Sequence, residues 1–208
     1  MTTQQGLRAR KKQQTREHIS DRATELFLAR GFDRVTIAEV AQAADVAKMT
    51  VTNYFPRKED LALDLGEVYV DQLAAVVRER EPGQSALAAL RHAYLTAVAA
   101  HSMLIGFSGE PFARMIADSP ALTARVREFH DDREVALAKT LAAETGADDI
   151  TPRVAAAQLA GVERVLFDEV TRRTLAGESN DAIAAALFRD ARVAFDALEP
   201  GLGSYAVR

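Results

Sequence analysis

Helical periodicity in an alanine-rich chain is the feature that most constrains the fold. Alanine supplies 40 of the 208 residues, and it has the highest intrinsic helix propensity of the amino acids. Between breaks that contain Pro or Gly, apolar residues recur three and four positions apart, and no run of alternating β-branched residues interrupts them. The sequence therefore predicts an all-α fold.

About nine helices are expected from the positions of these breaks. Ser119-Pro120 and Thr151-Pro152 each place a hydroxyl at the N-cap and a proline at the first helical position. Thr36 and Glu39 have the spacing of a capping box. The predicted helices cover residues 15–30, 37–44, 48–54, 58–80, 84–102, 103–117, 121–144, 152–177 and 181–198.

The charge is divided unevenly along the chain. The net charge of −4 by itself argues against a partner that is a polyanion. Residues 1–60, however, hold 11 Lys+Arg against 8 Asp+Glu, a net of +3, whereas residues 61–208 hold 15 against 22, a net of −7. A basic head on an acidic body is expected when one small module contacts a polyanion.

The first basic residues stand together before any acid. Arg8, Arg10, Lys11, Lys12 and Arg16 all precede Glu17. Two interpretations stay open for this run: a solvated flexible tail, or a contact with a DNA groove or backbone.

Several classes of protein are disfavoured by composition. The chain has no Cys, which excludes disulfides and thiolate metal sites, and its four His are scattered. No apolar run reaches the ~18 residues that a membrane span needs, and the polar N-terminus does not have the pattern of a secretory signal. We therefore expect a cytoplasmic protein with no membrane partner, no metal and no cofactor.

Residues 36–56 have the pattern of two short helices joined by a tight turn. Ile37, Val40 and Ala41 form one apolar side of the first helix, and Val51 and Phe55 are spaced to pack inward from the second. The residues left facing outward on the second helix are Lys48, Met49, Thr50, Thr52, Asn53 and Tyr54. This is the helix-turn-helix arrangement that places a recognition helix in a major groove.

The residues of this stretch resemble a known family. The run Thr36 to Ala41, the run Val46 to Leu61, and the end of the first helix at Leu26 to Phe32 are similar to the N-terminal domain of TetR-family regulators. The similarity covers about residues 12–65. It implies a homodimer that binds DNA, with a C-terminal domain that binds a small effector and controls repression.

The resemblance also implies roles for single residues. Thr36, Tyr54 and Lys58 correspond to positions that contact phosphates, and Lys48, Met49, Thr50 and Asn53 to positions near bases or backbone. Lys and Asn suit guanine and adenine edges. Ala47, Met49 and Thr52 differ from the residues common in the family (Ser, Gly and Tyr), so a base preference cannot be transferred.

The resemblance divides the chain into three parts: a basic flexible tail (1–14), a helix-turn-helix DNA-binding domain (15–60), and a helical domain for effector binding and dimerisation (61–208). The last two predicted helices carry wide apolar stripes and small residues, so we expect them to form a four-helix dimer interface.

A lipophilic effector is expected to bind in a largely apolar cavity of the last part. The candidate lining residues are Tyr94, His101, Met103, Phe107, Met115, His130 and Phe167. Aromatic and Met residues at such spacing also serve as ordinary core.

The sequence motifs bear on two alternative functions. An enzyme is disfavoured because no His has Glu three residues before it and no nucleophile, phosphate-loop or zinc-protease motif occurs. A DNA-binding protein without any ligand stays open, and it would lack a compound that releases it from DNA. We expect a ligand-responsive repressor of a (pseudo)palindromic operator.

Overall fold

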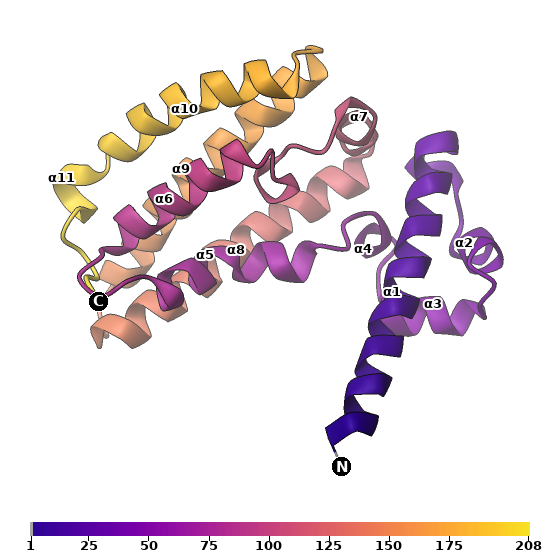
Figure 1. Cartoon of the computed structure of the whole chain (residues 1–208). Coiled ribbons are helices and arrows are strands. Elements are labelled where there is room, and N and C mark those ends of the chain that lie inside the picture. The colour runs from indigo at the N-terminus through magenta and orange to yellow at the C-terminus, as the bar shows by residue number, and fades with distance from the viewer. Residues whose placement is uncertain (1) are drawn as a thin grey trace. The chain divides into compact units, whose positions relative to one another are not determined.

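The computed structural model describes the backbone of residues 2–208 and the side chains from Arg10 onward. Within this range all regular elements are helices and no strand occurs (Figure 1), so the all-α prediction is confirmed. The α-helices are α1 (Thr2–Arg30), α2 (Ile37–Ala43), α3 (Lys48–Tyr54), α4 (Glu59–Ala62), α5 (Gly66–Glu79), α6 (Ala86–Ala99), α7 (Glu110–Asp118), α8 (Pro120–Thr145), α9 (Thr151–Leu175), α10 (Asn180–Asp196) and α11 (Glu199–Leu202). Two 3-10 turns, η1 (Phe32–Arg34) and η2 (Met103–Ile105), complete the set.

The chain forms two compact units. Unit 1 comprises Met1–Gly66 with Met115–Arg125, and unit 2 comprises Glu67–Arg114 with Val126–Arg208. Within unit 1, helix α1 packs against α2, η1 and α4, and α2 packs against α3. Within unit 2, helix α10 packs against both α9 and α6.

The core of unit 1 is small and apolar. Phe27 and Phe32 place their ring centroids 5.0 Å apart. The side chains that are almost completely buried beside them are Ile19, Ala23, Val40, Val51, Phe55 and Leu61. Because these residues come from α1 to α4, their burial fixes the arrangement of all four helices.

Local chemistry sets the ends of the helices around this core. The Thr36 hydroxyl accepts from Glu39 N, and the Glu39 carboxylate accepts from Thr36 N at 2.8 Å, so the predicted capping box is confirmed. In the turn between α2 and α3, Asp45 has φ of 52°, a left-handed conformation that Asp tolerates better than most residues. Helix α8 begins at Pro120, where the Ser119 hydroxyl accepts from Leu122 N.

Helix α1 is longer than predicted. It was expected to begin near residue 15, but residues 10–14 are helical as well, so the predicted start of this helix was wrong. Gln, Lys and Arg have good helix propensity, which explains the continuation. The side chains of residues 1–9, including Arg8, lie outside the described part.

The predicted helix 58–80 is two helices. The chain leaves helical geometry at Leu63 (φ −111°, ψ 48°) and resumes it at Gly66. Within the break, the Asp64 carboxylate accepts from the Ser20 hydroxyl at 2.7 Å and Asp64 O accepts from Arg16 at 3.1 Å. Hydrogen bonds to α1 therefore compete with continuation of the helix, and no local pattern signals them.

Two further predicted helix boundaries were wrong. Of the predicted helix 103–117, only η2 and α7 are helical, because Gly106 (φ 107°) and Gly109 (φ 78°) occupy positive φ. Thr151 is not the cap of α9. Helix α9 already begins at Thr151, so this residue lies inside the first turn. The Asp149 carboxylate, which precedes the helix, accepts from Thr151 N at 2.8 Å.

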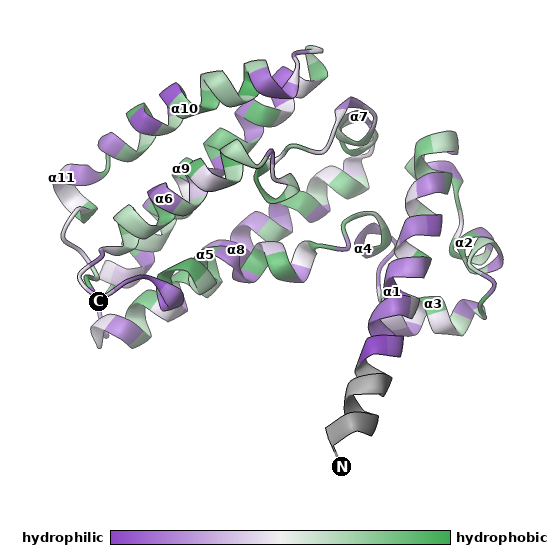
Figure 2. Ribbon diagram, viewed as in Figure 1, coloured by the Kyte–Doolittle hydropathy of each residue, from purple (hydrophilic) through white to green (hydrophobic). Residues whose placement is uncertain are grey.

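The core of unit 2 is larger and is formed mainly by α5, α6, α8, α9 and α10. Tyr94 and Phe195 lie inside it with ring centroids 5.9 Å apart. The apolar residues in Figure 2 alternate with polar ones along these helices, as expected for amphipathic helices around a core.

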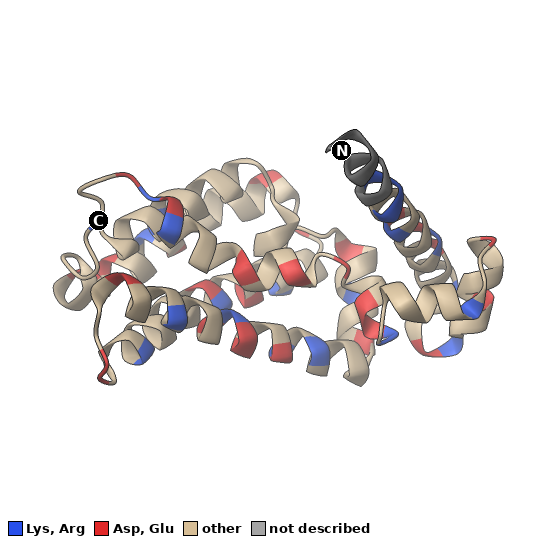
Figure 3. Ribbon diagram, turned by 90° about the horizontal axis from the view of Figure 1, so that it is seen from below, with Lys and Arg blue, Asp and Glu red and all other residues tan. Residues whose placement is uncertain are grey.

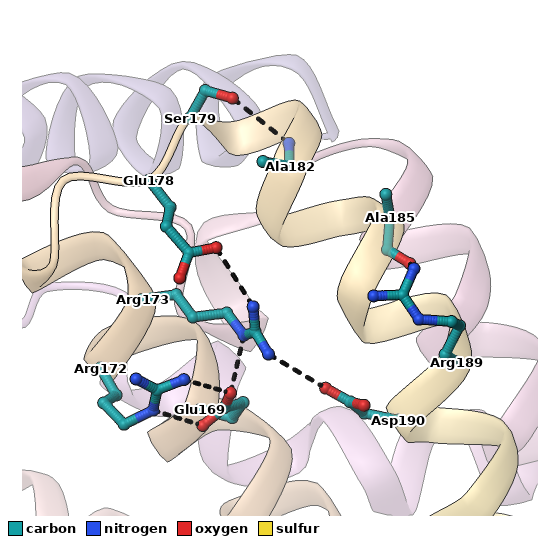
Figure 4. A network of polar contacts seen from close by, with 9 residues as sticks. All are labelled: Glu169, Arg172, Arg173, Glu178, Ser179, Ala182, Ala185, Arg189 and Asp190. Carbon is teal, nitrogen blue, oxygen red and sulfur yellow. Dashed lines mark hydrogen bonds and ion pairs between the residues drawn. The ribbon is translucent and has the colours of Figure 1, made fainter.

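A polar network joins the end of α9 to α10 (Figure 4). Arg173 bonds to Glu169 at 2.6 Å and to Glu178 at 3.1 Å, and its guanidinium lies 3.8 Å from Asp190 on α10. Arg172 pairs with Glu169 through two bonds of 2.7 Å, and this pairing lowers the pKa of Glu169 to about 2. The Ser179 hydroxyl accepts from Ala182 N and caps α10. The network therefore fixes the tight connection between the last two long helices.

Replacement of the Glu39 carboxylate tests how much the capping box at the start of α2 contributes to stability. Hydrogen bonds from Thr36 and Arg30 lower the pKa of Glu39 to about 2. A lowered pKa stabilises the folded state above the unfolded pKa of about 4.5, and this contribution is lost as the pH falls toward 2. Glu39→Gln is therefore expected to be less stable than the wild type at pH 7, with a difference that shrinks between pH 4.5 and pH 2. Urea unfolding at several pH values measures it, and a difference independent of pH would contradict the assignment.

Candidate functional site

Helix α3 presents an exposed polar face from unit 1. Lys48, Met49 and Asn53 are exposed, and Met49 retains 70% of its surface. Thr50, Thr52 and Tyr54 are half-buried at the sides of this face. Because Val51 is fully buried on the opposite side, the predicted division of α3 into inner and outer residues is confirmed. Ala47 makes no side-chain cap, as its residue type requires.

The buried end of α3 is held by α1. Phe55 is 1% exposed, and the Arg16 guanidinium lies 4.4 Å from the centroid of its ring. The same Arg16 donates to Asp64 O. A cation over an aromatic face is attracted by the ring quadrupole, so Arg16 links α1 to the end of α3 and to the break before α5.

The N-terminus of α2 lies at the start of the helix-turn-helix. Thr36 is exposed, and its backbone N and hydroxyl both donate to the Glu39 carboxylate at 2.8 Å. Glu39 also accepts from Arg30 at 2.7 Å. Helix N-termini attract anions through free amides and the helix dipole. At the start of α2 the Glu39 carboxylate already accepts a hydrogen bond from the Thr36 amide.

Lys58 has a structural contact that the sequence did not reveal. Its ammonium group donates to Phe32 O at 2.6 Å and lies 4.2 Å from the centroid of the Phe32 ring. Burial lowers the pKa of Lys58, and the nearby Asp33 and Glu59 charges oppose this shift. Lys58 therefore fastens η1 to the start of α4.

The residues expected to line an effector cavity fall into separate places. His130 and Phe167 lie together with Tyr69, with ring centroids between 5.4 and 6.0 Å apart. His101 stacks on Phe107, with centroids 5.1 Å apart. These residues and the buried Tyr94 belong to unit 2.

Two of the expected lining residues are not interior residues of unit 2. Met103 is 53% exposed, since the predicted helix around it is only a 3-10 turn. Met115 is buried but belongs to unit 1.

A buried polar cluster in unit 2 was missed by the sequence reasoning. Arg133 and Glu163 form an ion pair of 3.2 Å, and their side chains are only 3% and 4% exposed. Arg133 also donates to Gln72 and lies 4.3 Å from the centroid of the Tyr69 ring. Tyr69 Oη lies 2.8 Å from His130 Nδ1. Charged residues seldom lie inside a core, so periodicity alone predicts them on the surface.

Burial controls the protonation of this cluster. Desolvation raises the pKa of Glu163, and the Arg133 charge opposes this shift. Desolvation and the Arg133 charge together lower the pKa of His130 to about 4. His130 is therefore neutral at pH 7 and offers one ring nitrogen as an acceptor. Arg133 Nε and Tyr94 Oη are buried without a hydrogen-bond partner among the described protein groups.

A groove of about 530 Å³ lies on unit 2 between α6 and α10. Its lining residues are Arg91, Leu95, Phe188, Arg192 and Asp196. None of the seven predicted effector-binding residues lines this groove. In the part of the chain that the structure describes, no helix has both the length and the apolarity to cross a bilayer.

Comparison with known proteins agrees with this geometry. Residues 19–65 match the family model of bacterial regulatory proteins of the tetR family. The chain is 30% identical over 172 residues to the HTH-type transcriptional regulator TcmR of Streptomyces glaucescens, which covers 79% of this chain and 76% of TcmR. The chain belongs to the TetR family.

Other relatives of this TetR-family chain extend over most of its length. The putative mycofactocin biosynthesis transcriptional regulator MftR of Mycobacterium tuberculosis is 28% identical over 195 residues, covering 86% of this chain and 94% of MftR. Among solved structures, the TetR-family repressor AlkX from Dietzia is similar with a TM-score of 0.53 and 20% identity, covering 92% of this chain and 96% of AlkX. The fold is thus that of TetR-family regulators, and the helix-turn-helix of unit 1 is that family's DNA-binding element.

Breaking the buried ion pair is expected to destabilise unit 2 strongly. Glu163→Ala leaves the Arg133 charge buried and unpaired, which costs about 3–5 kcal/mol. Replacing both partners, as Arg133→Met with Glu163→Leu, is expected to cost much less, because no charge is left without a partner. Urea unfolding measures both variants. Glu25→Ala, which breaks the exposed pair with Arg22, is the matched control and is expected to change stability by less than about 1 kcal/mol.

Proposed function

We propose that this regulator is a homodimeric repressor that binds a (pseudo)palindromic operator through α2 and α3 and is released by a small lipophilic effector. The observation that carries the proposal is the outer face of α3. Its exposed residues Lys48, Met49 and Asn53 stand on a helix whose other side is anchored by the buried Val51. A short helix with one polar outer face suits a major groove ~12 Å wide.

We assign the outer residues of α3 to the bases and the flanking residues to phosphates. Lys48 and Asn53 carry the donors that suit guanine and adenine edges, and Met49 offers an apolar contact for a thymine methyl group. Thr50 and Thr52 stand beside these contacts.

Thr36 and Tyr54 are assigned to phosphates. For Lys58 we propose a contribution through its positive charge, because its ammonium group already donates to Phe32 O.

Dimerisation through α9 and α10 is supported by apolar residues that unit 2 leaves exposed there. Val165 on α9 is 58% exposed, and Phe188 and Val193 on α10 are 43% and 72% exposed. Such residues on two adjacent helices favour a self-complementary interface across a two-fold axis. A dimer of this kind presents two helix-turn-helix elements to two half-sites, which matches a (pseudo)palindromic operator.

For the effector we propose the interior of unit 2 near Tyr94, His130 and Phe167. An apolar interior with a few converging polar groups is typical of ligand sites. Unit 2 holds two polar groups in its apolar interior: the neutral His130 beside Phe167, and the Tyr94 hydroxyl, which has no hydrogen-bond partner among the described groups. His101 and Phe107 form a second aromatic contact in the same unit.

The release mechanism requires a difference in affinity between two states. An effector that binds better to a conformer with incorrectly spaced DNA-binding helices shifts the dimer off the operator. Since chromosomal DNA is the proposed partner, we place the protein in the cytoplasm.

The first experiment is a footprint of the purified protein on the DNA that flanks its own gene. A mobility-shift screen of small molecules on the protected fragment then tests the effector. Failure to bind any duplex at low salt would overturn the proposed function. Operator binding that no compound releases would favour the alternative of a DNA-binding protein without a ligand.

Replacing the outer residues of α3 is expected to change base preference. Lys48→Ala and Asn53→Ala each remove a base contact worth about 1–3 kcal/mol of discrimination, so operator affinity falls about 5- to 150-fold while binding to unrelated duplex changes little. Fluorescence anisotropy on both duplexes measures the ratio. Thermal unfolding serves as a control, because exposed residues contribute little to stability. Equal losses on both duplexes would contradict base contacts by these residues.

Charges on the exposed apolar residues of α9 and α10 are expected to separate the dimer. Val165→Glu with Val193→Glu buries two carboxylates per protomer in the proposed interface, so light scattering is expected to report a monomer. Val135→Glu on α8, where the wild-type side chain is 50% exposed, is the matched control and is expected to stay dimeric. A dimer that survives the double substitution would exclude this interface.

A further inference from the structure

We propose that the first described turns of α1 form a second DNA-binding surface, in which Arg10, Lys11 and Lys12 bind backbone phosphates beside the operator half-site without regard to sequence. The proposal rests on the DNA binding proposed above and extends it beyond the helix-turn-helix. It assigns a function to a basic segment that the family motif of α2 and α3 does not include.

Among the residues whose side chains the structure describes, no acid forms an ion pair with the cations of this surface. Arg10, Lys11 and Lys12 are exposed, and no ion pair joins any of them to another residue whose side chain the structure describes. The positions three and four residues later on the helix, 13 to 16, hold Gln, Gln, Thr and Arg, so neighbouring pairs of the usual helical spacing are absent. The nearest acid along α1, Glu17, instead accepts from Gln13 at 2.9 Å.

Other arginines of the protein contrast with this cluster. Arg125 pairs with Asp60 at 2.8 Å, Arg133 with Glu163, and Arg173 with acids on both α9 and α10. Like charges four positions apart on a helix, as at Lys12 and Arg16, destabilise it by a few tenths of a kcal/mol per pair. An uncompensated cluster of this kind fits a polyanion, which removes that repulsion on binding.

Helical structure gives the cluster a defined place in unit 1. The cations lie on the continuous helix α1 rather than on a free tail (Figure 3). Arg16, on the same helix, contacts the Phe55 ring at the end of α3. Since a helix rises 1.5 Å per residue, Arg10 to Lys12 lie about 6–9 Å from this contact along the axis of α1.

The distance along α1 between these cations and the end of α3 determines which phosphates the cations can reach. B-DNA carries one phosphate charge per ~1.7 Å of its axis, so several phosphates fall within 6–9 Å of any point on a duplex. Long Lys and Arg side chains on a helix anchored at the end of α3 can therefore bind phosphates while α3 occupies the groove. The contact adds affinity but no base readout, because phosphates carry no sequence information.

The test removes the three charges in the full-length protein. Arg10→Gln, Lys11→Gln and Lys12→Gln together are expected to weaken binding to the footprinted operator and to an unrelated duplex of equal length by the same factor, at least about 10-fold. Each phosphate contact contributes about 0.9 to the slope of log K against log salt, so the slope is expected to fall by about 3 per bound protomer. Fluorescence anisotropy at several salt concentrations measures affinity and slope, and circular dichroism confirms that the helix remains.

Two controls accompany the triple variant. Arg78→Gln, Arg127→Gln and Lys139→Gln remove three exposed cations from unit 2, with the same change in net charge, and are expected to leave the slope unchanged. Arg10→Lys, Lys11→Arg and Lys12→Arg keep the charges and are expected to retain wild-type binding.

The outcomes separate this proposal from the proposed function. If the wild type binds no duplex, both fail. If the wild type binds its operator and the triple glutamine variant binds with the same affinity and slope, only the second surface is excluded. If the unit 2 control loses as much affinity and slope as the triple variant of α1, the effect comes from net charge, and the proposal is overturned. A loss confined to RNA or to anionic vesicles, with duplex DNA binding unchanged, would also overturn it.

Discussion

The seven-residue helix α3 depends on buried contacts for its position, and the face that we propose to bind DNA depends on α3. An isolated helix shorter than ~12–15 residues is marginal in water, so α3 cannot hold its outer face by itself. Val51 and Phe55 bury its inner side, and Arg16 covers the Phe55 ring from α1. These contacts determine which residues of α3 remain exposed, and they also connect the recognition helix to the basic first turns of α1.

In unit 2 the buried polar groups need hydrogen-bond and ion-pair partners away from water, and this need determines their positions. Arg133 and Glu163 are buried as a pair, and Arg133 reaches Gln72 and the Tyr69 ring as well. Arg80 is only 5% exposed, pairs with Glu144 and donates to Ala206 O at 2.9 Å. Buried charges of this kind tolerate few arrangements. Such a core gives unit 2 a defined interior, which the proposed release by an effector requires.

Several helix ends that depend on neighbouring residues were predictable. The capping box at Thr36, the start of α8 after Ser119 and the bounds of α3 follow from chemistry within four residues. The break between α4 and α5 was not predictable, because Asp64 bonds to Ser20, 44 residues away. Helical periodicity continues through that break, so local propensity favours the wrong structure there.

In the candidate site, too, some features were predictable from the sequence and others were not. The outward residues of α3 follow from the spacing of Val51 and Phe55, since a helix repeats every 3.6 residues. No spacing predicts the contact of Lys58 with Phe32 O, the burial of Arg133, or that Met115 belongs to unit 1. By itself the sequence determined an all-α chain with a helix-turn-helix and a basic first segment. Only the tertiary structure decided that this segment continues as helix and which partner each charged side chain has, because such pairings depend on how distant segments pack.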